Sequence, residues 1–224
     1  MNSERLRKDW FIERDCPLYQ NPEHFCFNTD STLLAQFAQP RKGEKILEIG
    51  CNNAAVLLWM DRFDVRQLDG VEILEEPARL ARLNLETFAR HPWNIFCGDV
   101  KDLAPGGYDL VLSNPPFFPL ESGMQEDNLD YRQLGRFEVN LDLNSLIAHA
   151  SRQLRSNGRF ILVHRPERLA QILKAFEENS LSLRRFATAY DCRDQEAKSI
   201  LLEGVKEGNC SVMMEKPVWI GRSS

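Results

Sequence analysis

The sequence predicts an α/β fold built on a doubly wound, mostly parallel sheet. Short apolar segments, typical of strands covered on both faces, alternate with segments of helical periodicity along most of the chain. The first pair is a strand expected over residues 45–50 and a helix over 54–60, joined by the turn Cys51-Asn52-Asn53. Strand, glycine turn and helix form the nucleotide-binding opening of a doubly wound sheet, where backbone amides at the helix start meet an anion.

The chain before this unit is predicted to pack on it. Residues 1–27 have no clear period but carry Trp10, Phe11, Tyr19, Phe25 and Phe27, too many aromatic side chains for a free tail. We therefore expect an N-terminal extension (1–27) packed on a domain of residues 28–224. Asn28-Thr29-Asp30-Ser31 predicts a helix start. Thr29 and Asp30 are candidate cofactor ligands there, although plain capping residues have the same pattern.

Polar side chains stand at the ends of the predicted strands. Glu48 and Gly50 close the first strand, and Glu72 closes the second. An acid at the end of the second strand is placed to accept from both hydroxyls of a ribose. Asp99 ends the third strand, where it accepts from the amino group of an adenine or, alternatively, caps the helix that follows. These residues are predicted to line a cofactor site.

The segment 109–118 is an apolar run that stops at Asn114-Pro115-Pro116-Phe117. Neither proline can donate to a strand ladder, so the strand must end there in a stiff turn. The Asn114 side-chain oxygen and the Pro115 carbonyl are two acceptors that can receive both hydrogens of a planar amino group. Phe117 offers a flat face on which an aromatic base can stack. From the tetrapeptide alone, a plain turn at the end of a strand stays open.

The rest of the chain continues the alternation. A polar segment, 119–140, has the length and position of a lid or substrate-reading loop. We expect a helix capped by Asp142 and ended by Asn157-Gly158, and another begun by Pro166. Strands are expected over residues 159–164, 183–189 and 199–204, with a closing piece near 210–214.

Composition narrows the class of protein. The 224 residues, 43% of them hydrophobic, are enough for one large domain, and no apolar run reaches membrane-spanning length. No secretory signal is evident, so we expect a cytoplasmic protein. Six scattered cysteines and four distant histidines indicate neither a metal site nor a disulfide framework. The net charge is −5, but residues 151–224 carry 13 Lys and Arg against 9 acids, an excess of four positive charges that suits phosphate contacts.

The motifs at the predicted strand ends and at the predicted helix start 28–31 resemble those of the class I methyltransferases that use S-adenosylmethionine. Three segments resemble more narrowly the bacterial family that methylates N6 of adenosine 37 in a valine tRNA. They are Phe25-Cys26-Phe27-Asn28-Thr29-Asp30-Ser31, Arg136-Phe137-Glu138 and His164-Arg165-Pro166-Glu167-Arg168-Leu169. The resemblance covers nearly the whole chain. It implies a Rossmann-like seven-stranded sheet with an antiparallel C-terminal hairpin, S-adenosylmethionine as cofactor and a tRNA anticodon loop as substrate.

The resemblance also assigns residues. It makes Asn114, Pro115, Pro116 and Phe117 catalytic, with Asn114 also beside the cofactor. Candidates for contacts with the RNA are Arg136, Arg165, Arg168 and Lys198, each of which also suits a surface salt bridge. The family's loop after the first strand usually has three alternating glycines, whereas Asn52 and Ala54 replace the second and third here. Asn52 can adopt a left-handed backbone and keep the turn, while the Ala54 methyl is expected to weaken cofactor binding.

Two other functions stay open from the sequence. The same tetrapeptide suits a glutamine side chain, as in the N5-methyltransferases of protein release factors, although those usually end it in Tyr. A non-catalytic RNA-binding protein with a degenerate cofactor loop is the other reading, favoured by Cys51-Asn52-Asn53-Ala54. The oligomeric state is not indicated, and a monomer is the simplest expectation.

Overall fold

The computed structural model describes residues 6–24, 26–117, 141–191 and 196–221. The predicted lid (119–140), Phe25 and Arg136 lie outside these ranges. Within them, no helix combines the length and the apolar composition that a membrane crossing requires.

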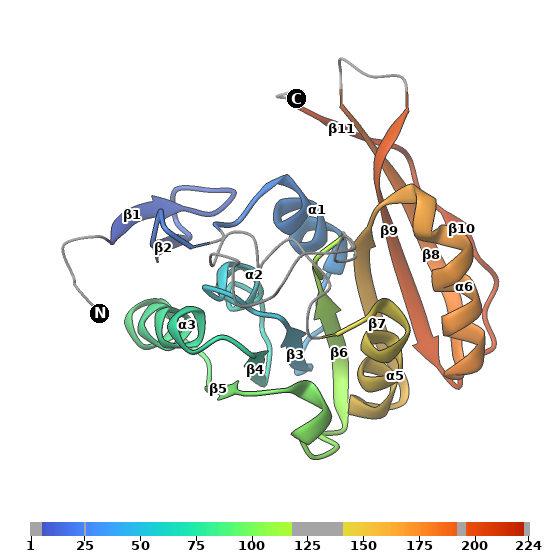
Figure 1. Ribbon diagram of the computed structural model, residues 1–224, viewed down its shortest axis with the longest axis horizontal. Helices are drawn as coiled ribbons and strands as arrows, with labels where there is room; N and C mark the ends of the chain where they lie inside the picture. The colour runs from blue at the N-terminus through green and yellow to red at the C-terminus, as the bar shows by residue number, and fades with distance from the viewer. Residues whose placement is uncertain (1–5, 25, 118–140, 192–195, 222–224) are drawn as a thin grey trace, which may run out of the picture.

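The sheet has the predicted doubly wound order. Its five parallel strands lie in the order β5 (Trp93–Cys97), β4 (Gln67–Glu72), β3 (Lys45–Ile49), β6 (Tyr108–Ser113) and β7 (Leu154–His164). The hairpin of β8 (Leu181–Asp191) and β9 (Ala197–Lys206) adds two antiparallel strands, with β9 between β7 and β8. The seven-stranded sheet and its antiparallel hairpin are therefore confirmed (Figure 1).

Two short strands extend the edge of this sheet. β10 (Met213–Met214) and β11 (Val218–Ile220) both pair in parallel with β8. The sequence predicts only a closing piece near residues 210–214, because segments of two or three residues carry no periodicity. The end of the β8–β9 hairpin projects beyond the rest of the molecule, with β11 beside it (Figure 1).

Helices cover both faces of the sheet. α1 (Thr29–Ala38), α2 (Ala55–Met60) and α3 (Glu75–Phe88) pack on one face, where they meet strand residues such as Ile46 and Leu110. α5 (Leu143–Gln153) and α6 (Leu169–Glu178) pack on the other face, against Leu47 and Val111. Neighbouring residues of one strand thus belong to different cores, as the period of two requires.

One predicted boundary is wrong. α5 ends at Gln153 and β7 starts at once with Leu154, so Asn157-Gly158 do not end the helix. They lie in β7, where the pairing with β6 shifts register. Asn157 has a left-handed φ of 61°, and a Cβ at Gly158 would lie 2.9 Å from the backbone oxygens of Arg155 and Tyr108. The pair therefore forms a bulge, in which turn residues are as much at home as at a helix end.

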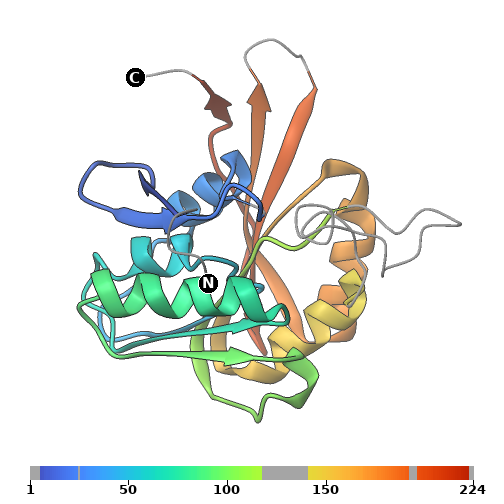
Figure 2. The same ribbon diagram turned by 60° about the vertical axis from the view of Figure 1, so that its left-hand side comes forward.

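The N-terminal segment forms a hairpin of β1 (Arg7–Trp10) and β2 (Pro17–Gln20), which lies beside α3 (Figure 2). Phe11 and Leu18 are fully buried in the same core as α1 and α2. The fully buried Asn84 of α3 accepts a hydrogen bond from the Tyr19 amide (2.7 Å) and donates to the Tyr19 carbonyl (2.9 Å). A buried amide satisfied by backbone groups fixes the hairpin to the domain.

A buried ion network ties the C-terminal hairpin to α1. The Glu203 carboxylate on β9 is 1% exposed and lies 2.7 Å from Arg185 and 3.5 Å from Arg159. Arg159 also contacts Glu44 at 2.9 Å, and Arg185 donates to the Phe37 carbonyl at the end of α1 (2.8 Å). The network lies at the strand ends opposite those that carry the predicted site.

We expect Glu203→Ala to lower the free energy of unfolding by about 3 kcal/mol, because it leaves two buried guanidinium groups short of a counter-charge. Urea unfolding followed by circular dichroism measures this change. Glu178→Ala is the control, since it removes an exposed partner of Lys174 and should change stability by less than about 0.5 kcal/mol. Equal effects of the two substitutions would contradict the assigned role of the network.

Candidate active site

The predicted site residues gather at one edge of the sheet. β3, β4 and β6 are parallel neighbours, so their carboxyl ends meet at that edge. The chain runs from β3 outward to β4 and β5 and then returns to β6 on the other side of β3. Such a switch in strand order leaves a crevice outside the carboxyl ends, where ligands of open α/β sheets bind.

The turn after β3 confirms the predicted backbone of Asn52. Gly50, Asn52 and Ala54 have φ values of 74°, 46° and 62°, all in the left-handed region. A Cβ at Gly50 would meet nothing within 4 Å, so open space lies against this backbone. Ala54 is different, because the residue is 0% exposed and packs in the core. Its methyl group therefore does not line the open crevice, contrary to the expectation that it would obstruct a cofactor.

Glu72 supports this turn. One oxygen of its carboxylate accepts from the Asn52 amide (2.9 Å), and the other accepts from the Leu74 amide (3.0 Å). Burial raises the pKa of Glu72, while these backbone hydrogen bonds act in the opposite direction. Each carboxylate oxygen keeps a second lone pair, so the side chain can still accept from a ligand hydroxyl.

Glu48 lies close enough to Glu72 for their charges to interact, and it is less exposed to solvent. It is 4% exposed, and among the described residues its buried Oε2 atom has no hydrogen-bond partner. Burial first, and then the charge of Glu72, raise the pKa of Glu48 well above its usual value. A buried acceptor without a partner is costly in a protein, so a donor from a bound molecule would stabilise it.

Asp99 caps the short helix η2 (Val100–Asp102). Its Oδ1 accepts from the Lys101 amide (2.9 Å), and its Oδ2 lies 2.9 Å from the Lys101 ammonium nitrogen. Capping, one of the two roles expected for Asp99, is therefore observed. Contact with a cofactor adenine stays a prediction.

At the start of α1 the structure pairs Asp30 with Ser199, whereas the sequence predicts Thr29 and Asp30 as cofactor ligands. Thr29 is exposed, whereas Asp30 is 6% exposed and turned toward β9 and β7. Asp30 Oδ1 accepts from the Ser199 hydroxyl (2.5 Å), and Oδ2 lies 3.4 Å from the Arg165 guanidinium. The cofactor roles predicted for Thr29 and Asp30 thus have no support from these contacts. Ser199 is a new member, and no sequence pattern links it to a residue 169 positions earlier.

The Asn114 turn lies directly over α1. Asn114 Nδ2 donates to the Ser31 hydroxyl oxygen at 3.1 Å. The preceding Ser113 is 1% exposed and donates through its hydroxyl to the Ile49 carbonyl (2.9 Å), which fastens the end of β6 to the end of β3. Asn114, Pro115, Pro116 and Phe117 are all half-buried, so a ligand can reach them.

The Phe117 ring is held by two residues at the end of β7. The Arg165 guanidinium carbon lies 4.5 Å from the ring centroid, and the His164 ring lies 5.1 Å away at 66°. His164 is 0% exposed, and its Nδ1 accepts from the Arg165 amide (2.8 Å). Burial, with help from the charges of Arg168 and Arg165, lowers the pKa of His164 to about 4. The imidazole is therefore neutral at physiological pH.

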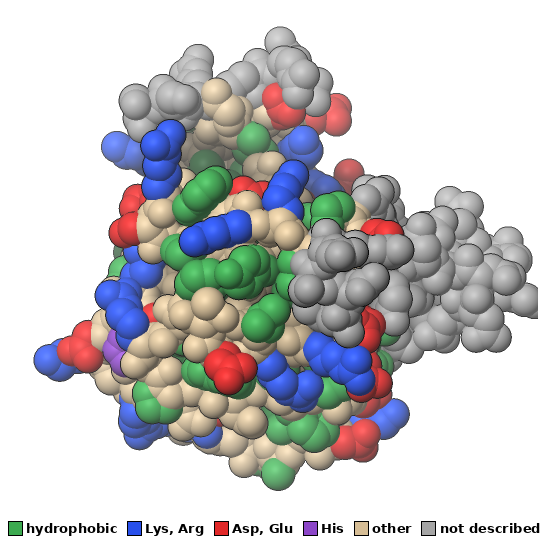
Figure 3. Space-filling view, turned by 90° about the vertical axis from the view of Figure 1, so that its left-hand side faces the viewer, with side chains coloured by type: hydrophobic (Ala, Val, Ile, Leu, Met, Phe, Trp, Pro, Cys, Tyr) green, Lys and Arg blue, Asp and Glu red, His purple; other side chains and the backbone are tan. Residues whose placement is uncertain are grey.

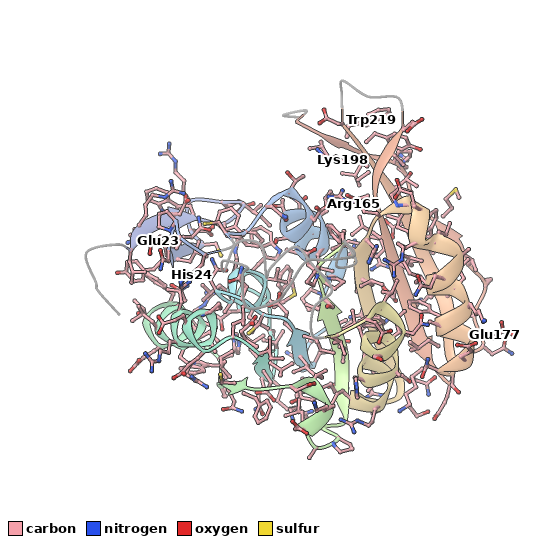
Figure 4. The ribbon with its side chains drawn as sticks, in the orientation of Figure 1. Glu23, His24, Arg165, Glu177, Lys198 and Trp219 are labelled. Carbon is pink, nitrogen blue, oxygen red and sulfur yellow. The ribbon has the colours of Figure 1, made fainter. Side chains whose placement is uncertain are left out.

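The candidate RNA contacts have protein partners. Arg165 donates to the Lys198 carbonyl (2.8 Å) and to Ser199 Oγ (3.1 Å). Arg168 donates to the Gln171 side chain (2.7 Å). The Lys198 ammonium nitrogen lies 3.5 Å from the Asp191 carboxylate. Arg165 and Lys198 lie close together near the base of the projecting hairpin (Figure 4). On the face shown in Figure 3, Lys and Arg side chains are interspersed with acidic and hydrophobic ones. Phosphate contacts therefore stay a prediction.

Among the residues that the structure describes, no three His, Cys, Asp or Glu side chains are grouped to hold a metal ion. Of the described cysteines, Cys16 and Cys51 are buried thiols, while Cys97 and Cys210 are partly exposed thiols.

Solved structures of the same fold define the class. The chain matches a predicted O-methyltransferase from Agrobacterium tumefaciens with a TM-score of 0.64 and 19% identity, over 87% of this chain and 90% of the other. It matches a ribosomal protein L11 methylase from Lactobacillus delbrueckii with a TM-score of 0.60 and 15% identity, over 83% of each chain. The fold is that of the class I methyltransferases.

Comparisons of the sequence narrow this class to one family. The model of the methyltransferase small domain matches residues 24–184. A tRNA1(Val) (adenine(37)-N6)-methyltransferase from a Flavobacteriaceae bacterium is 30% identical over 88% of this chain and 84% of its own length. One of the same description from Yersinia enterocolitica is 29% identical over 60% of this chain and 55% of its own length. The protein belongs to the methyltransferase small domain family and, within it, to the family of these tRNA adenine-N6 methyltransferases.

The protein is thus an S-adenosylmethionine-dependent methyltransferase, and the residues present fit that cofactor. Open space lies against the Gly50 backbone, the Glu72 carboxylate has lone pairs to spare, and Glu48 Oε2 is a buried acceptor in need of a donor. Gly50, Asn52, Glu72 and Glu48 are the residues that would hold it, and these contacts stay a prediction.

We expect Ala54→Gly to leave the affinity for S-adenosylmethionine within about twofold, because the Ala54 methyl is buried in the core. Glycine relieves the left-handed backbone strain, which should raise the free energy of unfolding by about 1 kcal/mol. Loss of the buried methyl group should lower it by about 0.8 kcal/mol, so the two effects should nearly cancel. Calorimetric titration measures the affinity. A tenfold gain in affinity would show that the methyl does obstruct the cofactor.

His164 should make stability depend on pH. Its folded pKa is about 4, below the value near 6.5 of an unfolded chain, so the unfolded state binds the extra proton as pH falls between these values. We expect the wild-type protein to lose about 2 kcal/mol more than His164→Asn between pH 7.5 and 5. Asn can still accept from the Arg165 amide. Parallel urea midpoints for the two proteins across this range would contradict the assignment.

Proposed function

We propose that the protein transfers a methyl group to N6 of adenosine 37 in the anticodon loop of a valine tRNA. The names of its relatives support this substrate. The observation that carries the chemistry is the orientation of the Asn114 amide. Asn114 follows the end of β6, and its Nδ2 donates to the Ser31 hydroxyl in α1. This leaves Oδ1 of the amide as an acceptor for an incoming base.

Asn114 and Pro115 act on the amine. The lone pair of an exocyclic adenine amine is delocalised into the ring, so the group is a weak nucleophile. Acceptance of its two hydrogens by Asn114 Oδ1 and the Pro115 carbonyl draws the nitrogen toward a tetrahedral shape, which returns the lone pair to it. S-adenosylmethionine supplies an electrophilic methyl carbon on a sulfonium. With the amine held by Asn114 and Pro115, this methyl group would pass to N6, the sulfur would keep the electron pair of its broken bond, and the amine would release one proton to water.

Phe117 aligns the base. Its ring provides a surface for stacking, which is worth about 1–3 kcal/mol per base. An adenosine in an anticodon loop is single-stranded, so its presentation costs less than extrusion from a duplex. The chain contributes alignment rather than acid–base chemistry, and alignment alone provides a large part of a rate. A neutral His164 beneath Phe117 is consistent with this role.

The substrate also bears on the setting. We propose a cytoplasmic location, because the proposed substrate is a tRNA. Arg165, Arg168 and Lys198 are the described candidates for contacts with the phosphates, and Arg165 and Lys198 lie close together. The excess of positive charge in residues 151–224 supports their assignment.

Asn114→Ala should lower kcat for tRNA methylation by at least about 100-fold, because the amine loses one of its two acceptors. The affinity for S-adenosylmethionine should stay within about threefold. Nucleoside mass spectrometry of the product tRNA measures the rate, and the exposed Asn94→Ala is the control. Ordinary turnover by Asn114→Ala would refute the mechanism.

The same assay separates the other functions. Purified release factor is offered beside total tRNA, and methylation of the protein alone would assign the glutamine activity. Absence of S-adenosylmethionine binding in calorimetry would favour the non-catalytic RNA-binding protein. Loss of N6-methyladenosine from one tRNA in cells that lack the protein would name both reaction and substrate.

A further inference from the structure

We propose that Asp30 and Ser31, in the first turn of α1, are positioning residues for the target base. Ser31 sets the direction of the Asn114 amide, and Asp30 holds Arg165 against Phe117. The inference rests on the proposed function, since it concerns how the same turn captures an adenine.

Ser31 decides which way the amide faces. Its hydroxyl has one hydrogen, which it donates to Asn28 Oδ1 at 3.3 Å. While that hydrogen is directed at Asn28, the Ser31 oxygen accepts from Asn114 Nδ2 at 3.1 Å. An amide turned by 180° would bring two oxygens together unless Ser31 gave up its bond to Asn28 and donated to Asn114 instead. Because Ser31 is 7% exposed, water has little access to compensate, and Asn114 Oδ1 is kept on the side of the crevice.

Asp30 acts on the aromatic half of the turn. Its carboxylate binds the fully buried Ser199 hydroxyl and the Arg165 guanidinium at once. Arg165 has two further anchors, Ser199 Oγ and the Lys198 carbonyl, so the guanidinium is fixed in place. That fixed cation lies 4.5 Å from the Phe117 ring centroid, where a cation–π contact stabilises the ring orientation.

These contacts exceed what a helix start needs. Asn28 already caps α1, with its side chain accepting from the Ser31 amide at 3.0 Å. An acid in the first turn also stabilises a helix while exposed to water. Asp30 is instead buried against β9, and burial of a carboxylate is costly unless its partners are well placed. Two adjacent residues thus hold the amide and the ring of one turn in a fixed relation.

The first experiment separates positioning from support. We compare wild type, Ser31→Ala and Ser31→Thr on a tRNA transcript, together with calorimetric titration of S-adenosylmethionine and thermal unfolding. Ser31→Ala should lower kcat by at least about tenfold with cofactor affinity within about threefold, and Ser31→Thr, which keeps the hydroxyl, should recover most of the rate. Ser145→Ala is the matched control, because Ser145 occupies the same turn position in α5 and donates to its cap Asp142 (2.6 Å).

The second experiment tests the route through Phe117. Asp30→Asn keeps the shape but removes the charge that holds Arg165, so it should raise KM for tRNA at least about fivefold. If Asp30 acts through the ring, Asp30→Asn should add little in a Phe117→Leu background. A full additional loss there would overturn this half of the proposal.

The outcomes are distinguishable from failure of the proposed function. If wild type methylates tRNA and Asn114→Ala does not, but Ser31→Ala keeps the wild-type kcat, the positioning role is wrong and the function stands. A fall in kcat for Ser31→Ala that Ser31→Thr does not recover, or that only tracks a lower unfolding temperature, also overturns the role of Ser31. If wild type leaves tRNA unmethylated, the proposed function itself fails.

Discussion

The constraint on which the site depends is the end of β6. Pro115 and Pro116 have no amide hydrogen, so the β6 ladder stops at Ser113, which is itself fastened to the end of β3 by a hydroxyl bond to Ile49. The Pro115 carbonyl and the Asn114 amide then stand at the carboxyl end of the strand, with the amide nitrogen bound to Ser31. A ligand with two donors on one atom fits such an edge, and an amino group is the simplest example. The substrate class follows from how the strand is terminated.

The remaining parts of the site are arranged around that strand end. The β3 turn, with Glu72 holding the Asn52 amide, makes the neighbouring space one for a nucleotide-like cofactor. On the other side, β7 and β9 bring His164 and Ser199 beneath the aromatic ring and the first turn of α1. The site thus joins residues from both halves of the sheet. Its rigidity comes from buried hydrogen bonds with few alternative partners.

The sequence predicts the fold well where burial gives a clear signal. The strand before Asn114 contains the continuous apolar run Leu110-Val111-Leu112, and the left-handed Asn52 follows from the chemistry of its side chain. Three of the four residues of the short β1 are exposed, so it shows no alternation, and Asn157-Gly158 suits a bulge as well as a helix end. The contact of Asp30 with Ser199 was not predictable, because neither periodicity nor spacing encodes a bond between residues so far apart.

The place of β9 has a consequence for biosynthesis. Because β9 lies between β7 and β8, the sheet cannot be completed until residues 197–206 have emerged from the ribosome. The same strand supplies Ser199, the partner of a residue near the beginning of the chain. A nascent or truncated polypeptide that lacks this strand therefore contains the Asn114 turn without its full support. Residues 197–206 are therefore needed before Asp30 can find its partner Ser199.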